Sequence, residues 1–176
     1  MTPASAFDDE QAAVTFHGKT YAYHFSAMLD APLAAVRAVV TDYDRLGRLN
    51  DSITDSRVLE RDGPHALRRL LALRHCLLLF CFDMRFVEDV RIEDHERLTV
   101  VNTTVVPAAS SFEDGVAEWR LEAVGPARTR MTLRATQTPD FWIPPLIGPL
   151  LLERVFVREV RETTDNIERL AAATAP

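Results

Sequence analysis

The sequence lacks the motifs that bind nucleotides and metals. Its six glycines form no GxGxxG, Walker-type or GxSxG loop, so neither a nucleotide cofactor nor a serine-hydrolase elbow is expected. Its five histidines form no HExxH pair and share no zinc-ligand pattern with a cysteine, so no metal site is expected. Lys19 is the only lysine and the formal net charge is -6. This balance argues against nucleic acid as a partner, because such binding needs clustered cations.

Long apolar runs are also missing, and no secretory leader is expected. No stretch approaches ~18 uninterrupted apolar residues, so a membrane-spanning helix is not expected. Residues 1–13 contain neither a basic n-region nor an apolar h-region, so no signal peptide is expected and a cytoplasmic location is the default. Cys76 and Cys81 are the only cysteines. Without a secretory signal we expect them to be reduced, partly buried thiols rather than a disulfide.

The composition is that of a soluble globular protein, with 47% apolar and 26% charged residues. A chain of 176 residues fits one domain and is large enough to enclose a hollow in its core. We expect residues 1–17 to be a flexible N-terminal segment and residues 18–173 to form a single domain.

The spacing of apolar residues predicts the order of the elements. Residues 19–30 alternate as a half-buried strand, and residues 32–43 repeat at helical spacing behind Pro32. A second, weaker short helix is expected at residues 44–51. Strands joined by short turns, and therefore antiparallel, are expected at 52–63, 65–79, 80–94, 96–107, 113–125 and 128–140.

The last element predicted is a long amphipathic helix over about residues 149–172, roughly 35 Å in length. It is the only long partner available to cover the apolar face of the sheet. The fold class expected is therefore α+β with the helix-grip arrangement. A curved antiparallel sheet of about seven strands wraps around the C-terminal helix, with two short helices after the first strand, and this geometry leaves room for a cavity.

Two strings carry a family resemblance: LDAPLAAVRAVVTDYDRLGRLNDSITDSRVLER (29–61) and PDFWIPPLIGPLLLERVFVREVRETTDNIERLA (139–171). They resemble the START-like (SRPBCC) superfamily, closest to its polyketide cyclase/dehydrase and lipid-transport branch, which includes coenzyme Q-binding proteins. The resemblance spans about residues 19–172 and implies a helix-grip domain. It does not by itself fix a function, because members include lipid carriers, hormone binders, cyclases and chaperone cofactors.

Nine residues are the candidate ligand contacts. Some are bulky apolar side chains expected to face the cavity, two are inward amides that can orient a ligand, and two lie on the loop before the last helix. They are Phe82, Met84, Phe86, Asn102, Trp119, Gln137, Phe141, Trp142 and Phe156. The alternative for each is ordinary core packing, or for the amides a hydrogen bond to nearby backbone.

The proline-broken segment 139–149 cannot form a regular helix or a central strand. It is either a packed loop or a gate at one end of the cavity, which would offer Trp142 to a membrane interface. A true membrane anchor is disfavoured because the apolar run is short.

The function expected is binding, and beyond binding intracellular transfer, of a hydrophobic small molecule such as a lipid, a quinone or a polycyclic compound. One alternative is a polyketide aromatase/cyclase-type enzyme that uses a polar pocket residue. A second is a protein-interaction domain with a filled core. The sequence offers no evident acid/base constellation, so no catalytic residue is named, no cofactor is expected, and the carrier is preferred to the enzyme.

Overall fold

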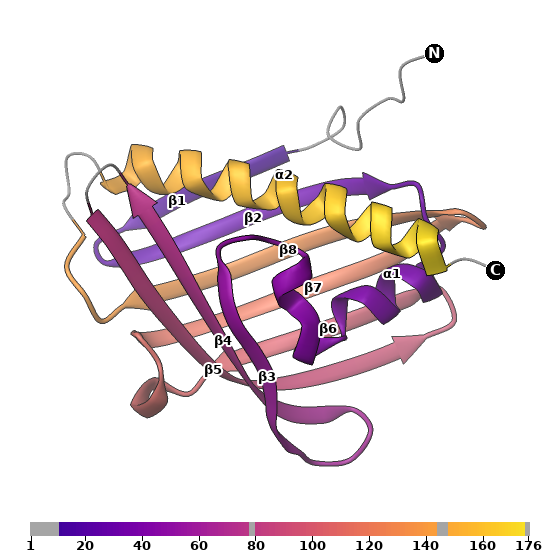
Figure 1. Ribbon diagram of the computed structural model, residues 1–176, viewed down its shortest axis with the longest axis horizontal. Helices are drawn as coiled ribbons and strands as arrows, with labels where there is room; N and C mark the ends of the chain where they lie inside the picture. Colours follow the sequence, from indigo (N-terminus) through magenta and orange to yellow (C-terminus); the bar gives the residue numbers. More distant parts are fainter. Residues whose placement is uncertain (1–10, 78–79, 144–147, 175–176) are drawn as a thin grey trace.

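The computed structural model describes residues 11–77, 80–143 and 148–174, and they form one sheet with helices against it (Figure 1). The strands are β1 (Gln11–His17), β2 (Thr20–Leu29), β3 (Ile53–Arg61), β4 (Ala66–Leu77), β5 (Phe80–His95), β6 (Leu98–Val105), β7 (Phe112–Gly125) and β8 (Arg128–Pro139). The helices are α1 (Leu33–Val40) and α2 (Gly148–Thr174), with the short 3-10 segments η2 (Tyr43–Arg48) and η3 (Pro107–Ala109).

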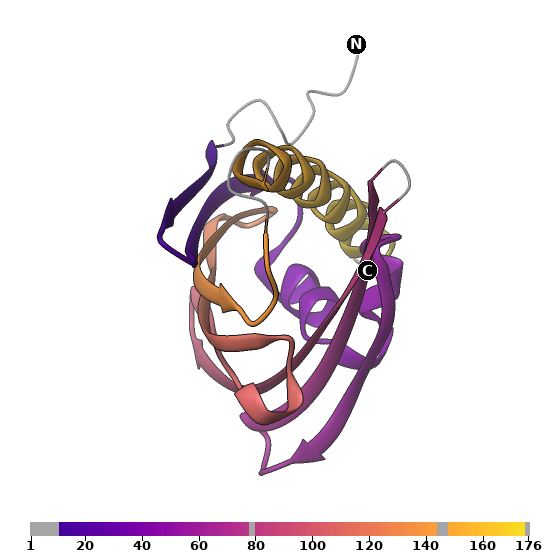
Figure 2. The same ribbon diagram turned by 90° about the vertical axis from the view of Figure 1, so that its left-hand side faces the viewer.

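The eight strands are ordered β1-β2-β8-β7-β6-β5-β4-β3, and every neighbouring pair is antiparallel. The sheet curls, so that its edges β1 and β3 come round on opposite sides of α2 (Figure 2). Helix α2 lies along the open, concave side (Figure 1), and α1 packs beneath its C-terminal half. This is the predicted helix-grip arrangement.

Inward positions of the strands and the C-terminal half of α2 build the main core. Its largest fully buried apolar side chains include Phe25, Leu29, Leu121, Met131 and Ile167. A smaller cluster of Phe86, Val105 and Phe112 lies apart from it. The rings of Phe86 and Phe112 stack with centroids 4.3 Å apart. Leu71 packs against both clusters.

The N-terminal boundary differs from the prediction. Residues 11–17, expected to belong to a flexible segment, form β1 and pair with β2 from Gln11 opposite Ser26 to His17 opposite Thr20. The sheet therefore has eight strands instead of about seven. An edge strand is held by backbone hydrogen bonds to its neighbour, and these need no strong apolar pattern. The rest of the expected segment, residues 1–10, lies outside the described residues.

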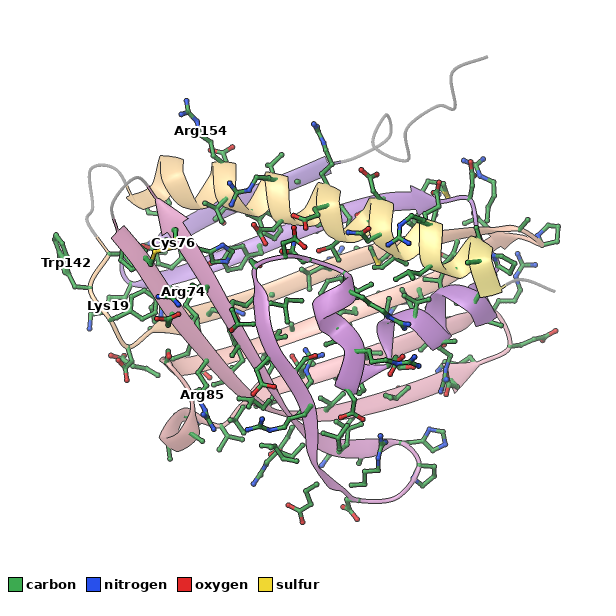
Figure 3. The ribbon with its side chains drawn as sticks, viewed as in Figure 1. Lys19, Arg74, Cys76, Arg85, Trp142 and Arg154 are labelled. Atoms are coloured by element: carbon green, nitrogen blue, oxygen red, sulfur yellow. A yellow bond between two sulfur atoms is a disulfide. The ribbon has the colours of Figure 1, made fainter. Side chains whose placement is uncertain are left out.

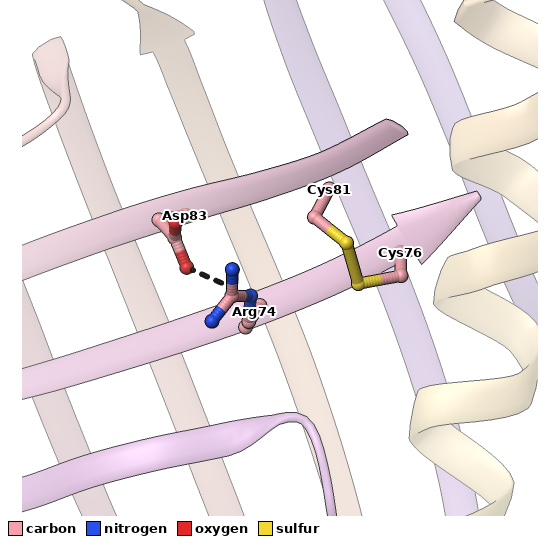
Figure 4. The surroundings of a disulfide bond; sticks show 4 residues. All are labelled: Arg74, Cys76, Cys81 and Asp83. Atoms are coloured by element: carbon pink, nitrogen blue, oxygen red, sulfur yellow. Dashed lines mark ion pairs between the residues drawn. A yellow bond between two sulfur atoms is a disulfide. The ribbon is translucent and has the colours of Figure 1, made fainter. Parts of the chain in front are cut away.

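The expectation of reduced cysteines is wrong. Cys76 and Cys81 occupy directly opposite positions on β4 and β5, with Cα atoms 3.9 Å apart, and they form a disulfide (Figure 4). The compartment alone does not decide the state of these cysteines, because the antiparallel pairing of β4 and β5 places the two residues opposite each other. Disulfides are typical of oxidising environments, so the cytoplasmic location stays a prediction that this bond does not favour.

None of the helices within the described ranges combines the length and apolar character that a bilayer span requires.

Candidate ligand-binding cavity

A cavity of about 280 Å³ lies between the concave face of the sheet and the N-terminal half of α2. An apolar cavity of roughly 150 Å³ already holds benzene. The space is therefore larger than a packing defect and large enough for a small organic guest. Among the described side chains of α2, the buried ones are Val160, Thr164, Ile167 and Ala171, which lie from the middle of the helix toward its C-terminal end.

Most of the cavity wall is apolar and comes from inward positions of successive strands. The bulky apolar side chains in the wall include Leu71, Met84, Phe86, Trp119 and Leu133 from the strands and Phe156 from α2. These side chains face inward because alternate residues of a strand point to the same face of the sheet. A wall of this kind binds apolar surface without demanding one particular shape.

One polar group in the wall is a buried ion pair between β4 and β5. Nε of Arg69 donates a hydrogen bond to Oε2 of Glu88 at 2.9 Å, and the hydroxyl of Thr103 donates to Oε1 of Glu88 at 3.1 Å. The Arg69 guanidinium also lies over the ring of Tyr43, 5.0 Å from its centroid. Because both charges are paired and hydrogen-bonded, neither is left free for a ligand.

A second polar group joins the other side of the cavity to α2. The hydroxyl of Ser52 donates to Oε2 of Glu159 at 2.6 Å. The amide of Asn50 donates to the backbone oxygen of Glu159 at 3.1 Å and to the hydroxyl of Thr163 at 3.3 Å. Nδ1 of His75 lies 3.7 Å from Oε1 of Glu159. All five residues line the cavity.

Burial lowers the pKa of His75, and the nearby Arg158 lowers it further, while Glu159 acts in the opposite direction. A histidine with a lowered pKa is neutral at pH 7. Its Nδ1 is buried and has no hydrogen-bond partner among the described residues. The neutral tautomer with the proton on Nδ1 is favoured, because otherwise a lone pair would face the carboxylate of Glu159.

Six of the nine predicted ligand contacts lie in the cavity wall. They are Met84, Phe86, Trp119, Gln137, Phe141 and Phe156. The structure thus gathers these residues from β5, β7, β8, α2 and the loop after β8. That they contact a ligand remains a prediction.

The other three predicted contacts do not line this cavity. Asn102 pairs with Arg91 and Glu118 on the outer face of the sheet, so the prediction that it points inward is wrong. Phe82 shares the inward face but lies close to the end of the β4–β5 hairpin and is 41% exposed. Trp142 is 76% exposed and points away from the cavity.

The segment 139–149 is only partly described, since residues 144–147 lie outside the described residues and α2 already begins at Gly148. In the described part, Phe141 and Ile143 line the cavity. The ring of Phe141 meets Phe112 edge-on, with centroids 6.0 Å apart. The loop therefore contributes a wall of the cavity on one side and the exposed Trp142 on the other.

The sequence prediction missed the charged and polar wall residues Arg69, His75, Glu88 and Glu159. None of the four is among the candidate ligand contacts. A signal was present: Arg69 and His75 share the parity of Leu71 and Leu73 on β4, and Glu159 follows Phe156 by three residues on α2. Polar residues on an otherwise apolar inward face indicate a functional wall or a satisfied pair.

The chain matches the family model described as polyketide cyclase / dehydrase and lipid transport over residues 23–172. No curated protein matches its sequence.

Solved structures with the same fold are similar along most of their length. Human StAR-related lipid transfer protein 5 superposes with a TM-score of 0.70 at 12% identity, covering 92% of this chain and 86% of that one. A STAR-related lipid transfer protein from Xanthomonas axonopodis gives 0.66 at 14% identity, covering 92% and 98%. The Zhui aromatase/cyclase from Streptomyces sp. R1128 gives 0.65 at 14% identity, covering 87% and 94%. At these identities the likeness is one of fold.

Proposed function

The chain belongs to the polyketide cyclase/dehydrase and lipid transport family, and on that premise we propose that it encloses one hydrophobic small molecule between its sheet and α2. The observation that carries this proposal is the cavity of about 280 Å³ with its largely apolar wall. Burial of apolar ligand surface stabilises such a complex by roughly 25 cal/mol per Å². The ligand proposed is a lipid, a quinone or a polycyclic compound.

The experiment is native mass spectrometry of gently purified protein, followed by extraction and identification of any bound molecule. The matched pair of variants is Ala135→Phe and Ala127→Phe. Ala135 lines the cavity, whereas Ala127 is exposed in the turn between β7 and β8. The proposal predicts an apolar guest in the wild type and in Ala127→Phe and its loss in Ala135→Phe. Thermal melting checks that both variants fold, because overpacking costs about 1–3 kcal/mol.

An empty protein that also fails to take up quinones, sterols or fatty acids would contradict the proposal. This result would favour the alternative that the chain is a protein-interaction domain. That alternative expects a filled core, so the cavity in the structure argues against it.

Beyond binding, we propose that the ligand is transferred through the end of the molecule where Trp142 is exposed. Trp142 lies at the same end as Lys19, Arg74, Arg85 and Arg154 (Figure 3). Lys19 and Arg74 are ion-paired with Glu113 and Asp83. The indole of Trp142 is the group suited to a bilayer interface, and contact with the membrane would be transient.

A polyketide aromatase/cyclase activity is the second candidate. It is favoured by one observation, the pair of His75 and Glu159 in the cavity wall, since a neutral histidine beside a carboxylate can accept a proton. The test is incubation with a linear poly-β-ketone and mass analysis for loss of water by ring closure. Catalysis that disappears in His75→Phe would favour the enzyme over the carrier.

A further inference from the structure

His75 has one hydrogen-bonding atom, Nε2, that the fold leaves available to a ligand. Nδ1 is directed into the protein, 3.7 Å from Oε1 of Glu159, and it is buried without a partner. Nε2 is not buried in this way, accepts no hydrogen bond from the described residues, and belongs to a side chain that lines the cavity. An imidazole arranged like this offers a cavity ligand one free lone pair.

The surroundings fix which nitrogen carries the proton. A small shift of Glu159 or His75 would close the 3.7 Å separation to hydrogen-bond length, with Nδ1–H donating to the carboxylate. Glu159 is itself held by the hydroxyl of Ser52 at 2.6 Å and lies 3.2 Å from the guanidinium of the exposed Arg158. These contacts hold the carboxylate in place beside Nδ1, and Nε2 remains the acceptor.

We propose that the cavity selects an apolar ligand that carries a hydroxyl group, such as a phenol or an alcohol, and that Nε2 of His75 accepts the hydrogen bond of that hydroxyl. This inference rests on the proposed function, because it names the class of molecule bound in the same cavity. Glu159 is a positioning residue, since it acts on the ligand through His75.

The charges of the wall make a carboxylate ligand unfavourable. Arg69 is the only arginine or lysine among the described wall residues, and Glu88 already neutralises it. An ionised fatty acid would bring its negative charge near Glu159 and meet the lone pair of His75. A ligand with carbonyl groups alone would leave Nε2 unpaired. A hydroxyl, in contrast, supplies the missing donor.

The test compares three probes with one aromatic body: naphthalene, 2-naphthol and 2-naphthoate. Dissociation constants are measured by calorimetry at pH 7.5 for the wild type and for His75→Phe, Glu159→Gln and His95→Phe. His95 is an exposed histidine at the end of β5 and does not line the cavity, so His95→Phe is the matched control. Phenylalanine keeps an aromatic ring at this position and removes the acceptor.

The proposal predicts that His75→Phe weakens 2-naphthol roughly tenfold, the value of one hydrogen bond, and changes the affinity for naphthalene much less, because naphthalene makes no hydrogen bond to the imidazole. Glu159→Gln should weaken 2-naphthol by a smaller factor, and His95→Phe should change neither probe. 2-Naphthoate should bind more weakly than naphthalene in the wild type.

Two other outcomes are distinguishable. If naphthalene and 2-naphthol lose affinity equally in His75→Phe, or both keep it, the hydroxyl site is refuted while the apolar cavity stands. If no probe binds to the wild type, the cavity itself fails as a binding site, and the proposed function and the hydroxyl site are refuted together.

Discussion

Nδ1 of His75 on β4 lies 3.7 Å from Oε1 of Glu159 on α2, and both side chains belong to the cavity wall. The hydrogen bonds of Asn50 and Ser52 to Glu159 reinforce this connection. On this side of the cavity, α2 is thus joined to the protein by polar groups. Farther along the helix, Ile167 packs in the apolar core and Asn166 donates a hydrogen bond to the backbone oxygen of Leu49. The arrangement combines a partly open cavity with groups that can recognise one polar atom of a guest.

The first prediction concerns the pH dependence of stability. Burial lowers the pKa of His75, so below pH ~6.5 the unfolded chain binds a proton that the folded protein resists. Stability therefore falls as the pH is lowered from about 6.5 through the folded pKa. In His75→Phe the free energy of unfolding should fall less steeply over this range, measured by urea denaturation at several pH values. An unchanged slope, with His95→Phe as the control, would show that His75 is not protected from protonation.

The second prediction concerns the buried pair of Arg69 and Glu88, whose side chains are 11% and 6% exposed. Glu88→Leu leaves the arginine charge buried and unpaired and should lower the free energy of unfolding by about 3–5 kcal/mol. The double variant Arg69→Met/Glu88→Leu should regain most of that loss. Denaturant titration of the three proteins measures this. Equal losses in the single and double variants would mean that the ion pair stabilises the fold directly.

The third prediction concerns transfer between membranes. Trp142→Ala should slow vesicle-to-vesicle transfer of a bound fluorescent ligand severalfold and leave its affinity unchanged, because the indole is 76% exposed and does not line the cavity. Val124→Ala is the control, since Val124 is an exposed apolar residue near the turn between β7 and β8. Transfer at the wild-type rate in Trp142→Ala would remove Trp142 from the route.

The fourth prediction concerns the disulfide. Cys76 and Cys81 are separated by five positions, so the bond closes a short loop and its entropic stabilisation is limited to about 2 kcal/mol. The double variant Cys76→Ser/Cys81→Ser should have a free energy of unfolding that is lower by about this amount, measured by denaturant titration. Iodoacetamide should label neither cysteine of the wild type until a reductant is added. Immediate labelling of both thiols would contradict the bond.

The order of the elements was predictable because the inward positions of most strands are apolar and the outward ones polar. Tyr23 and Phe25 on β2 and Trp119 and Leu133 on β7 and β8 follow this alternation, and the structure places all four on the inner face. The period of α2 likewise predicted the helix that covers the sheet. These features are local, so a sequence pattern suffices to find them.

The predictions failed where the local sequence pattern does not show which face of the sheet a residue lies on or which residue it faces. On β6 both Val100 and Val101 are buried, so alternation could not show on which face Asn102 lies. The opposition of Cys76 and Cys81 and the approach of Glu159 to His75 depend on strand register and on the placement of α2. Neither can be derived from the spacing of apolar residues.

The most direct test of the account is a crystal structure of the protein as purified, collected with and without xenon under pressure. The account predicts that a guest molecule or xenon occupies the space bounded by Trp119, Leu133 and Phe156, since gas atoms enter apolar cavities of this size. If these three side chains instead touch one another and neither guest nor xenon enters, the cavity does not exist and the binding function fails with it.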